Sequence, residues 1–464
     1  MNRVAVINVV GLCDRHIGPD MPFTQAFRSA GSKSCIDPAF PALTCSAQSN
    51  YLTGKHPSKH GIVGNGWYNH DLAEIQFWKQ PNQLVQAPKI WETMRKKYTE
   101  FTCAKVFWWY NMYSGADWSI TPRPIYRADG RKAFDIYTHP SHIRTNIQED
   151  LGIFPFPGFW GPAAGVNTPQ GSADCVSRWI AESAIWLEEQ YSPTLSLVYL
   201  PHLDYNLQRF GPKDSSIPAD LRLVDGIIHD LINYYENRGV QPILLSEYGI
   251  TEVNQAIHIN RTLREAGWIT VRDELGCEVL DPGASQAFAV ADHQIAHIYV
   301  NNKSILQDVR RRIEAIDGVH TVIDSEAKIE LGINHKRAGD FIAVSNENAW
   351  FTYYYWLDDE RAPDFARTVD IHRKPGYDPV ELFIDPKFLF PGYHISKRLL
   401  QKKIGLRMLM DVTPLDASLV KGSHGCRPSN PIDWPILITP ETAAPTKETI
   451  SSTEVHRLLL KMFD

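Results

Sequence analysis

Short apolar runs alternate with amphipathic stretches along the chain. Five apolar runs predict buried strands: 3–10 (RVAVINVV), 194–200 (TLSLVYL), 241–249 (QPILLSEYG), 295–300 (IAHIYV) and 320–323 (HTVI). Apolar residues spaced three and four apart predict helices over 86–98, 174–191, 218–239, 259–267 and 304–316. Strands that are apolar on both faces and alternate with helices are typical of a mostly parallel sheet covered on both sides.

Polar side chains follow two of these strands. The run PILL ends at Leu245, and Ser246, Glu247, Tyr248 and a glycine come directly after it. Asp204 comes shortly after the run that ends at Leu200. Ligands of such sheets bind beyond the carboxyl ends of the strands. We therefore expect Glu247, Tyr248 and Asp204 to belong to a functional site.

Two stretches interrupt the strand–helix rhythm. Residues 107–170 are rich in Trp, Tyr, Pro and Gly, and residues 335–420 contain FTYYYWLDDERAPDF and DIHRKPGYDPVELF. We interpret 107–170 as a cap insertion and 335–420 as a second cap or insertion region. The α/β catalytic core then comprises 1–106, 171–334 and 421–464.

Composition narrows the class of protein. The 464 residues are 43% hydrophobic and 22% charged, as in soluble globular proteins, with a formal net charge of -6. This charge argues against nucleic acid or an anionic membrane as a partner.

No apolar run reaches the roughly 20 residues of a membrane span, and no signal peptide is apparent. The seven scattered cysteines form no CxxC pair, which favours reduced thiols in a cytoplasmic protein. The oligomeric state stays open.

The segment 40–65, FPALTCSAQSNYLTGKHPSKHGIVGN, carries the most specific signal. Thr44 precedes small polar residues, which suits a helix N-terminus, where a threonine can cap the helix or face a bound anion. The segment resembles the type I phosphodiesterase and nucleotide pyrophosphatase family of the alkaline phosphatase superfamily. In that family a P-x-x-T element carries the nucleophile, and the Asn of TG-x-x-P-x-x-HGI-x-GN contacts the transferred phosphoryl group. The resemblance implies these roles for Thr44 and Asn65.

The resemblance also implies a fold and a metal cofactor. The fold is an alkaline-phosphatase-like three-layer α/β/α sandwich with a mostly parallel sheet and cap insertions. The cofactor is one or two divalent metal ions, usually zinc. The metal ligands it implies here are Asp204, Glu247 and His424, and further candidates are Gln208, Tyr248, Asp292, His293 and His372.

The metal-ligand motifs depart from the family pattern at several positions. Val10 stands where the first strand should end in Asp, and Gln208 stands where a His should follow Asp204 by four residues. Glu247 and Tyr248 replace an Asp–His pair. Because zinc prefers Cys, His and carboxylate ligands, the standard two-metal arrangement is in question.

The segment TPRPIYRADGRK in the first insertion carries candidate substrate-binding residues. They are Arg123, Tyr126, Arg131 and Lys132. Arginine and lysine side chains clamp phosphate or carboxylate groups, although a solvated charged loop has the same composition. The neighbouring FWWYNMY run either stacks on a flat ligand group or packs between cap and core.

These observations favour a metal-dependent hydrolase that cleaves a phosphodiester or pyrophosphate-type bond in a small anionic substrate through a covalent Thr44 intermediate. One alternative is a repurposed superfamily member that acts on a phosphonate or sulfate ester, or transfers a group, with a non-standard or absent metal site. The other is a protein that binds an anionic ligand without catalysis.

Overall fold

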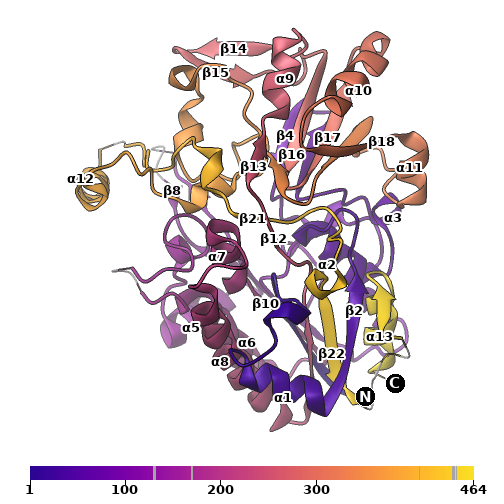
Figure 1. The fold of residues 1–464 in the computed structure, drawn as a ribbon. Helices are drawn as coiled ribbons and strands as arrows, with labels where there is room; N and C mark the ends of the chain where they lie inside the picture. Colours follow the sequence, from indigo (N-terminus) through magenta and orange to yellow (C-terminus); the bar gives the residue numbers. More distant parts are fainter. Residues whose placement is uncertain (129–131, 169–170, 407, 442–444, 446, 464) are drawn as a thin grey trace.

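A large central sheet forms the core of the lower lobe of the molecule (Figure 1). The computed structural model describes all residues except 129–131, 169–170, 407, 442–444, 446 and 464. The nine described strands run in the order β23-β2-β22-β11-β1-β10-β5-β6-β9. In chain order they are β1 (Arg3–Val9), β2 (Gly31–Asp37), β5 (Cys103–Val106), β6 (Trp118–Pro122), β9 (Ile136–His139), β10 (Leu195–Leu200), β11 (Val240–Leu245), β22 (Ile436–Pro440) and β23 (Thr449–Ser451).

The middle of this sheet is parallel. Strand β1 pairs in parallel with β10 and β11, and β5 continues the parallel order to β6. Strands β22 and β9 run antiparallel to their neighbours. The predicted mostly parallel sheet is confirmed, and β1 lies between the two strands whose ends carry the candidate polar residues.

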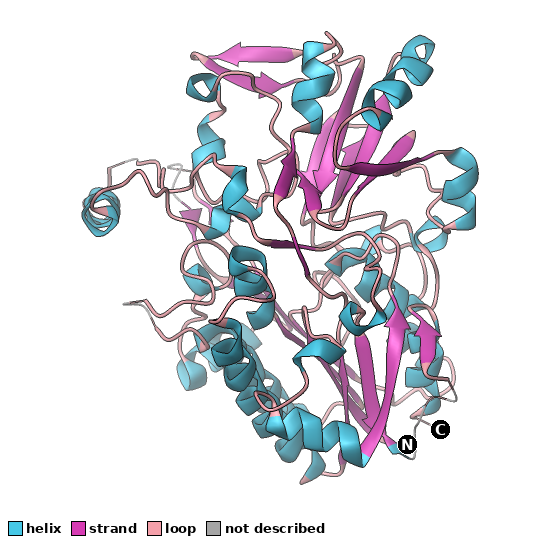
Figure 2. Cartoon of the chain, in the orientation of Figure 1, coloured by secondary structure: helices cyan, strands magenta, loops and turns pink. Residues whose placement is uncertain are grey.

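Helices cover the sheet on both sides, as Figures 1 and 2 show. Helices α1, α6 and α8 lie on one side, and α2 and α13 lie on the other. The helices of this lobe are α1 (Pro22–Ala30), α2 (Thr44–Thr53), α4 (Ile90–Met94), α5 (Ile143–Leu151), α6 (Cys175–Tyr191), α7 (His202–Phe210), α8 (Ile217–Glu236) and α13 (Glu454–Lys461). The helices predicted over 174–191 and 218–239 correspond to α6 and α8.

The upper lobe is built on a second sheet, in the order β16-β17-β19-β18. All its pairings are antiparallel. Its strands are β16 (Ala287–Asp292), β17 (Ile295–Val300), β18 (Val319–Ile323) and β19 (Phe341–Ser345), and the helices near it are α9 (Ile259–Glu265), α10 (Leu306–Glu314) and α11 (Ser325–Glu330). The apolar runs 295–300 and 320–323 are therefore strands of a separate antiparallel sheet. Conversely, β6 and β9, from the expected insertion 107–170, extend the main sheet. The proposed domain boundaries stay a prediction.

The remaining strands form short pairs. They are β3 (Gly66–Asn69) with β4 (Glu74–Phe77), β7 (Ile125–Tyr126) with β8 (Lys132–Ala133), β12 (Thr251–Glu252) with β21 (Gly422–Ser423), β13 (Gln255–Ile257) with β20 (Ala349–Phe351), and β14 (Val271–Glu274) with β15 (Cys277–Leu280). A four-residue helix, α3 (Pro57–His60), precedes β3.

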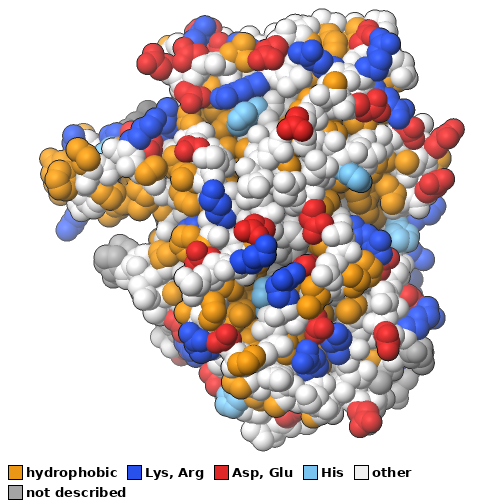
Figure 3. All heavy atoms as spheres, viewed as in Figure 1, with side chains coloured by type: hydrophobic (Ala, Val, Ile, Leu, Met, Phe, Trp, Pro, Cys, Tyr) orange, Lys and Arg blue, Asp and Glu red, His pale blue; other side chains and the backbone are white. Residues whose placement is uncertain are grey.

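The segment around α12 (Pro391–Lys403) projects from the body at the left of Figures 1 and 3. Figure 3 shows hydrophobic side chains on its surface. Those of Leu389, Phe390 and Tyr393 are among the exposed ones. Within the described part of the chain, no helix combines the length and apolar character that a membrane crossing requires.

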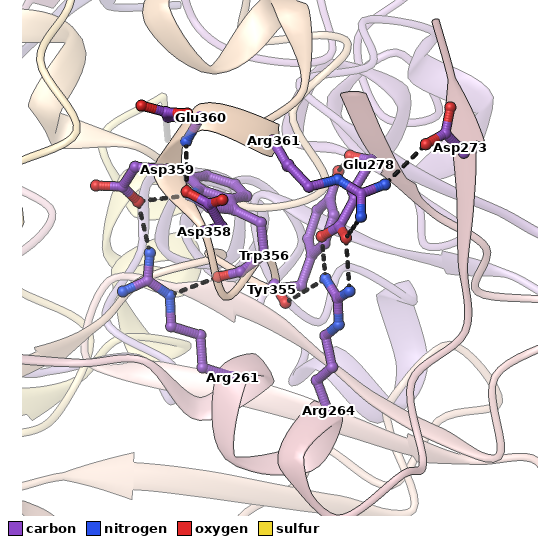
Figure 4. Close-up of polar contacts among 10 residues, drawn as sticks. All are labelled: Arg261, Arg264, Asp273, Glu278, Tyr355, Trp356, Asp358, Asp359, Glu360 and Arg361. Carbon is purple, nitrogen blue, oxygen red and sulfur yellow. Dashed lines mark hydrogen bonds and ion pairs between the residues drawn. The ribbon is translucent and has the colours of Figure 1, made fainter. Parts of the chain in front are cut away.

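Ion pairs fasten α9 to the hairpin β14–β15 and to the segment 355–361 (Figure 4). Arg264 on α9 makes a two-pronged contact with Glu278 on β15, with one N–O distance of 2.8 Å. The guanidinium nitrogens of Arg361 lie 3.4 Å from a carboxylate oxygen of Glu278 and 2.7 Å from a carboxylate oxygen of Asp273. Glu278 is only 5% exposed, so its carboxylate depends on these partners rather than on water.

We predict that Arg264→Ala lowers the free energy of unfolding by about 1–3 kcal/mol, because it removes charged donors from the buried carboxylate of Glu278. The midpoint of urea unfolding measures this. The control is Arg272→Ala, whose ion pairs to Glu274 and Asp281 involve a side chain that is 54% exposed. It should change stability by less than about 1 kcal/mol. Equal effects of both variants would contradict the structural importance of Arg264.

Candidate active site

The candidate site lies where β10 and β11 end on either side of β1. Helix α7 begins two residues after β10 and carries Asp204 in its first turn. Ser246 and Glu247 follow β11, and Tyr248 comes next. The glycine after Tyr248 is required by close packing, since a Cβ atom on Gly249 would lie 1.8 Å from the backbone oxygen of Asp433. The two strand ends thus bring Asp204 and Tyr248 together, as the sequence predicted.

Thr44 is the first residue of α2, which confirms the predicted helix N-terminus. Its hydroxyl lies 3.1 Å from the hydroxyl of Tyr248. The Thr44 side chain is inside the molecule, with 4% of the residue exposed. The N-terminal end of a helix favours negative charge, so a phosphoryl group beside Thr44 would gain from the α2 dipole.

Asp204 is the hub of a buried hydrogen-bond network. Tyr248 donates to its Oδ1 at 3.2 Å, and the amide of Gln208 donates to its Oδ2 at 2.8 Å. The Gln208 oxygen in turn accepts from the hydroxyl of Tyr377 at 3.0 Å. Burial raises the pKa of Asp204 to about 7, although both hydrogen bonds act to lower it.

Glu247 is held by a second network, between β1 and α2. Its Oε1 accepts from the amides of Asn8 on β1 and Gln48 on α2, both at 2.5 Å. Gln48 is fixed by the backbone N–H of Trp109, which donates to its oxygen at 2.6 Å. Burial raises the pKa of Glu247 to about 8, and its hydrogen bonds offset this only in part.

Asn65 is hydrogen-bonded to the N-terminal end of α2. Its Oδ1 accepts from the backbone N–H of Cys45 at 3.1 Å. Its own backbone and side-chain N–H groups donate to the carboxylate of Asp292, at 2.8 and 3.1 Å. Asp292 therefore orients Asn65, and burial raises the pKa of Asp292 to about 7. The structure brings Asn65 and Thr44 together, as the resemblance implied.

Four aromatic rings stack beside Asp204. His424 lies flat on Tyr248, with ring centres 3.5 Å apart and an interplanar angle of 6°. The ring centre of His293 lies 3.7 Å from that of His424 and 3.6 Å from that of Tyr377. His424 Nδ1 is 2.8 Å from the backbone oxygen of Ala42, which can only accept, so Nδ1 carries the proton. Burial lowers the pKa of His424 to about 3, which keeps the ring neutral.

The donor atoms near Asp204 do not match those of a zinc site. Val10 is buried and has no donor atom. Gln208 uses its nitrogen on Asp204 and its oxygen on Tyr377, and an amide is not among the ligands that zinc prefers. The hydroxyl of Tyr248 is likewise shared between its two neighbours. Zinc sites are built from Cys, His and carboxylate, and three of the six expected positions lack them.

Across the described ranges, no three His, Cys, Asp or Glu side chains gather closely enough to hold a metal ion. The carboxylates accept hydrogen bonds from amides and a phenol instead. Three potential ligand atoms stay open here, since Glu247 Oε2, His293 Nδ1 and His424 Nε2 are buried and without a partner among the described residues. The residues present therefore do not fit the two-metal site, and metal binding by Asp204, Glu247 and His424 stays a prediction.

Other predicted residues lie in different surroundings. His372 is 3.3 Å from the backbone oxygen of Phe77. The hairpin β7–β8 carries Tyr126 and Lys132, and the Lys132 ammonium lies 5.7 Å from the centre of the Tyr126 ring. Arg123, just before this hairpin, is exposed. Arg131 is outside the described residues. The substrate-binding role of this group stays a prediction.

Three residues of the site were not singled out from the sequence. Asn8 is a polar residue within the apolar run VAVINVV, and Gln48 follows Thr44 by one helical turn. Both patterns could have signalled a role at the site. Tyr377 lies in an irregular segment far along the chain, and only the fold places it against Gln208.

Comparisons with known proteins agree with this architecture. The family model "Type I phosphodiesterase / nucleotide pyrophosphatase" matches residues 4–378. A curated relative from Saccharomyces cerevisiae, ectonucleotide pyrophosphatase/phosphodiesterase 2, is 24% identical over 230 residues. The match covers 47% of this chain and 39% of the yeast protein, so the chain spans about two fifths of that relative's length.

Solved structures share the fold at low sequence identity. Human ectonucleotide pyrophosphatase/phosphodiesterase 5 superposes with a TM-score of 0.60 at 14% identity, over 99% of this chain and 94% of that one. Phosphonoacetate hydrolase from Sinorhizobium meliloti 1021 superposes with a TM-score of 0.61 at 12% identity, over 100% and 96%. The predicted alkaline-phosphatase-like α/β fold is confirmed. On the family match over most of its length, the chain belongs to the type I phosphodiesterase and nucleotide pyrophosphatase family, a family of hydrolases.

Proposed function

We propose that this protein hydrolyses a phosphodiester or pyrophosphate-type bond in a small anionic substrate, with Thr44 as the nucleophile. The observation that carries the proposal is the position of the Thr44 hydroxyl at the N-terminus of α2, with Asn65 tied to the same helix end through the Cys45 N–H. Family membership supports the reaction class. The cytoplasmic location expected from the sequence stays a prediction.

The reaction would proceed in two displacements. Thr44 Oγ1 attacks phosphorus, the bond to the leaving group breaks, and a phosphorylated threonine forms. A water molecule then attacks the same phosphorus and releases Thr44. The α2 dipole and the Asn65 amide face the charge that develops on the non-bridging oxygens. Asp292 contributes by holding Asn65 in place.

The substrate class has one specific alternative. A structural neighbour is a phosphonoacetate hydrolase solved with phosphonoacetate and with phosphonoformate, and another neighbour, ectonucleotide pyrophosphatase/phosphodiesterase 5, is solved with AMP. A phosphonate is therefore the second candidate substrate for this chain. The donor atoms around Asp204 do not fit the expected zinc ions.

We predict that Thr44→Ala lowers hydrolysis of a p-nitrophenyl phosphodiester at least about 1,000-fold, since it removes the attacking oxygen. Release of p-nitrophenol is the measurement, and p-nitrophenyl phosphonates and sulfates are assayed beside it. Thr53→Ala is the matched control, because Thr53 ends the same helix and its hydroxyl bonds the Ser49 oxygen. Its activity should match the unmodified protein. Full activity of Thr44→Ala would overturn the proposal.

We also predict that Asn65→Ala lowers kcat by about 100- to 1,000-fold, as the loss of one oxyanion donor does elsewhere. Its KM should change less, because the donor acts mainly on charge that develops in the transition state. Steady-state kinetics on the same phosphodiester give both constants. A large rise in KM with unchanged kcat would assign Asn65 to substrate binding alone.

A further inference from the structure

The residues that replace the metal ligands form one continuous line of hydrogen bonds that ends at Thr44. From its far end, Tyr377 donates to Gln208, and Gln208 donates to Asp204. Tyr248 approaches the other oxygen of Asp204 and also contacts Thr44. Two substitutions of the family pattern, Gln208 and Tyr248, thus meet on the same retained aspartate.

The hydrogen bonds in this line have a direction. A carboxylate oxygen only accepts, so the phenol of Tyr248 points its proton at Asp204 Oδ1. The Tyr248 oxygen is then left to accept from the hydroxyl of Thr44. Thr44 therefore directs its proton at Tyr248 and keeps its lone pairs for an electrophile. Hydrolases that use a protein side chain as the base arrange a nucleophile, a base and an orienting group in the same way.

The surroundings fix this geometry. Tyr248 is 2% exposed, and its ring lies flat on His424. His424 is anchored to the Ala42 oxygen, two residues before Thr44. The same histidine therefore fixes the Tyr248 phenol relative to the start of α2. Hydrogen bonds in such a water-excluded setting are stronger than at a surface, and a preorganised line needs no rearrangement when the proton moves.

We propose that Tyr248 and Asp204 form a proton relay that activates Thr44 in place of divalent metal ions. This inference rests on the proposed function of Thr44. Tyr248 is a catalytic residue in the relay because it touches the reacting oxygen. Gln208 and Tyr377 are positioning residues. Gln208 donates a hydrogen bond to Asp204, and Tyr377 donates one to Gln208.

The Thr44 Oγ1–P bond forms while the bond from phosphorus to the leaving group breaks, and the leaving group departs with that electron pair. The proton of Thr44 passes to the Tyr248 oxygen as the Tyr248 proton passes to Asp204 Oδ1. In the second displacement, water attacks phosphorus and the bond from phosphorus to Thr44 Oγ1 breaks. Asp204 returns its proton through Tyr248 to Thr44 Oγ1, and the extra proton of the attacking water is lost from the phosphate product to solvent.

Glu247 is the competing acceptor for the Thr44 proton. Contact with Thr44 is among the effects that lower the pKa of Glu247. Glu247 Oε1 already accepts from Asn8 and Gln48, whereas Glu247 Oε2 is buried and has no hydrogen-bond partner among the described residues. Tyr248, by contrast, has a single acidic neighbour to receive its proton and a direct contact of 3.1 Å with Thr44. Substitution of each residue separates the two routes.

The test is covalent labelling of Thr44 by a small fluorophosphonate, in which the Oγ1–P bond forms and fluoride leaves. Intact-mass and peptide mass spectrometry give the rate and the site, with the full-length protein in excess chelator. We expect Thr44 to be labelled without metal. We expect Tyr248→Phe to lower the maximal labelling rate about 100-fold or more, with little change in the probe concentration at half-maximal rate.

Tyr205→Phe is the matched control. Tyr205 is a buried tyrosine next to Asp204 in α7, and its hydroxyl has no hydrogen-bond partner within the described chain. It should label at the unmodified rate. Glu247→Gln should label faster than Tyr248→Phe. Gln208→Leu should lower the maximal rate less than Tyr248→Phe and leave half-saturation unchanged, since it acts only through Asp204.

Each other outcome has a defined meaning. Labelling of Tyr248→Phe at the unmodified rate overturns the relay and leaves the Thr44 proposal intact. Labelling that requires added Zn²⁺ or Mn²⁺ overturns the relay in favour of metal activation. A larger loss in Glu247→Gln than in Tyr248→Phe assigns the base to Glu247 and also overturns the relay. Absence of labelling at Thr44 under every condition overturns both the relay and the proposed function.

Discussion

The structure of the site depends on the hydrogen bonds that its buried carboxyl groups accept. Asp204, Glu247 and Asp292 are all buried, and burial raises the pKa of each. An isolated buried carboxylate is costly, so each accepts hydrogen bonds, although Glu247 Oε2 has no partner among the described residues. The donors come from amides and a phenol: Asn8, Gln48, Asn65, Gln208 and Tyr248. The polar residues of the site are therefore coupled, and none can be replaced without leaving a neighbour unpaired.

This constraint explains why several unusual residues occur together. Exchange of a single metal ligand would leave the others as unpaired buried groups. In this chain the exchanges compensate one another, because Gln208 and Tyr248 both donate to Asp204. Asn8, from the strand that ends at the valine in place of the family's aspartate, donates to Glu247. The family fold is retained while the polar centre is rebuilt from neutral donors.

The sequence was sufficient for the parallel sheet, the helix start at Thr44 and the strand-end position of Asp204 and Glu247, because these follow from local periodicity and a contiguous motif. It was not sufficient for the second lobe. The runs 295–300 and 320–323 are as apolar as parallel strands, and only their pairing partners reveal an antiparallel sheet. The sequence also did not predict the position of Tyr377 or the ring stack around His424, because contacts between distant segments leave no local pattern.

In this account, the Tyr248 hydroxyl donates a hydrogen bond to Asp204 at the position where the family would place a metal ion. The most direct measurement is a crystal structure of the protein grown with excess Zn²⁺, with zinc located by anomalous scattering. The account predicts that the Tyr248 hydroxyl stays within hydrogen-bond distance of Asp204 and Thr44 and that no zinc lies between them. A zinc ion coordinated by Asp204, Glu247 and His424, with Tyr248 displaced, would contradict it.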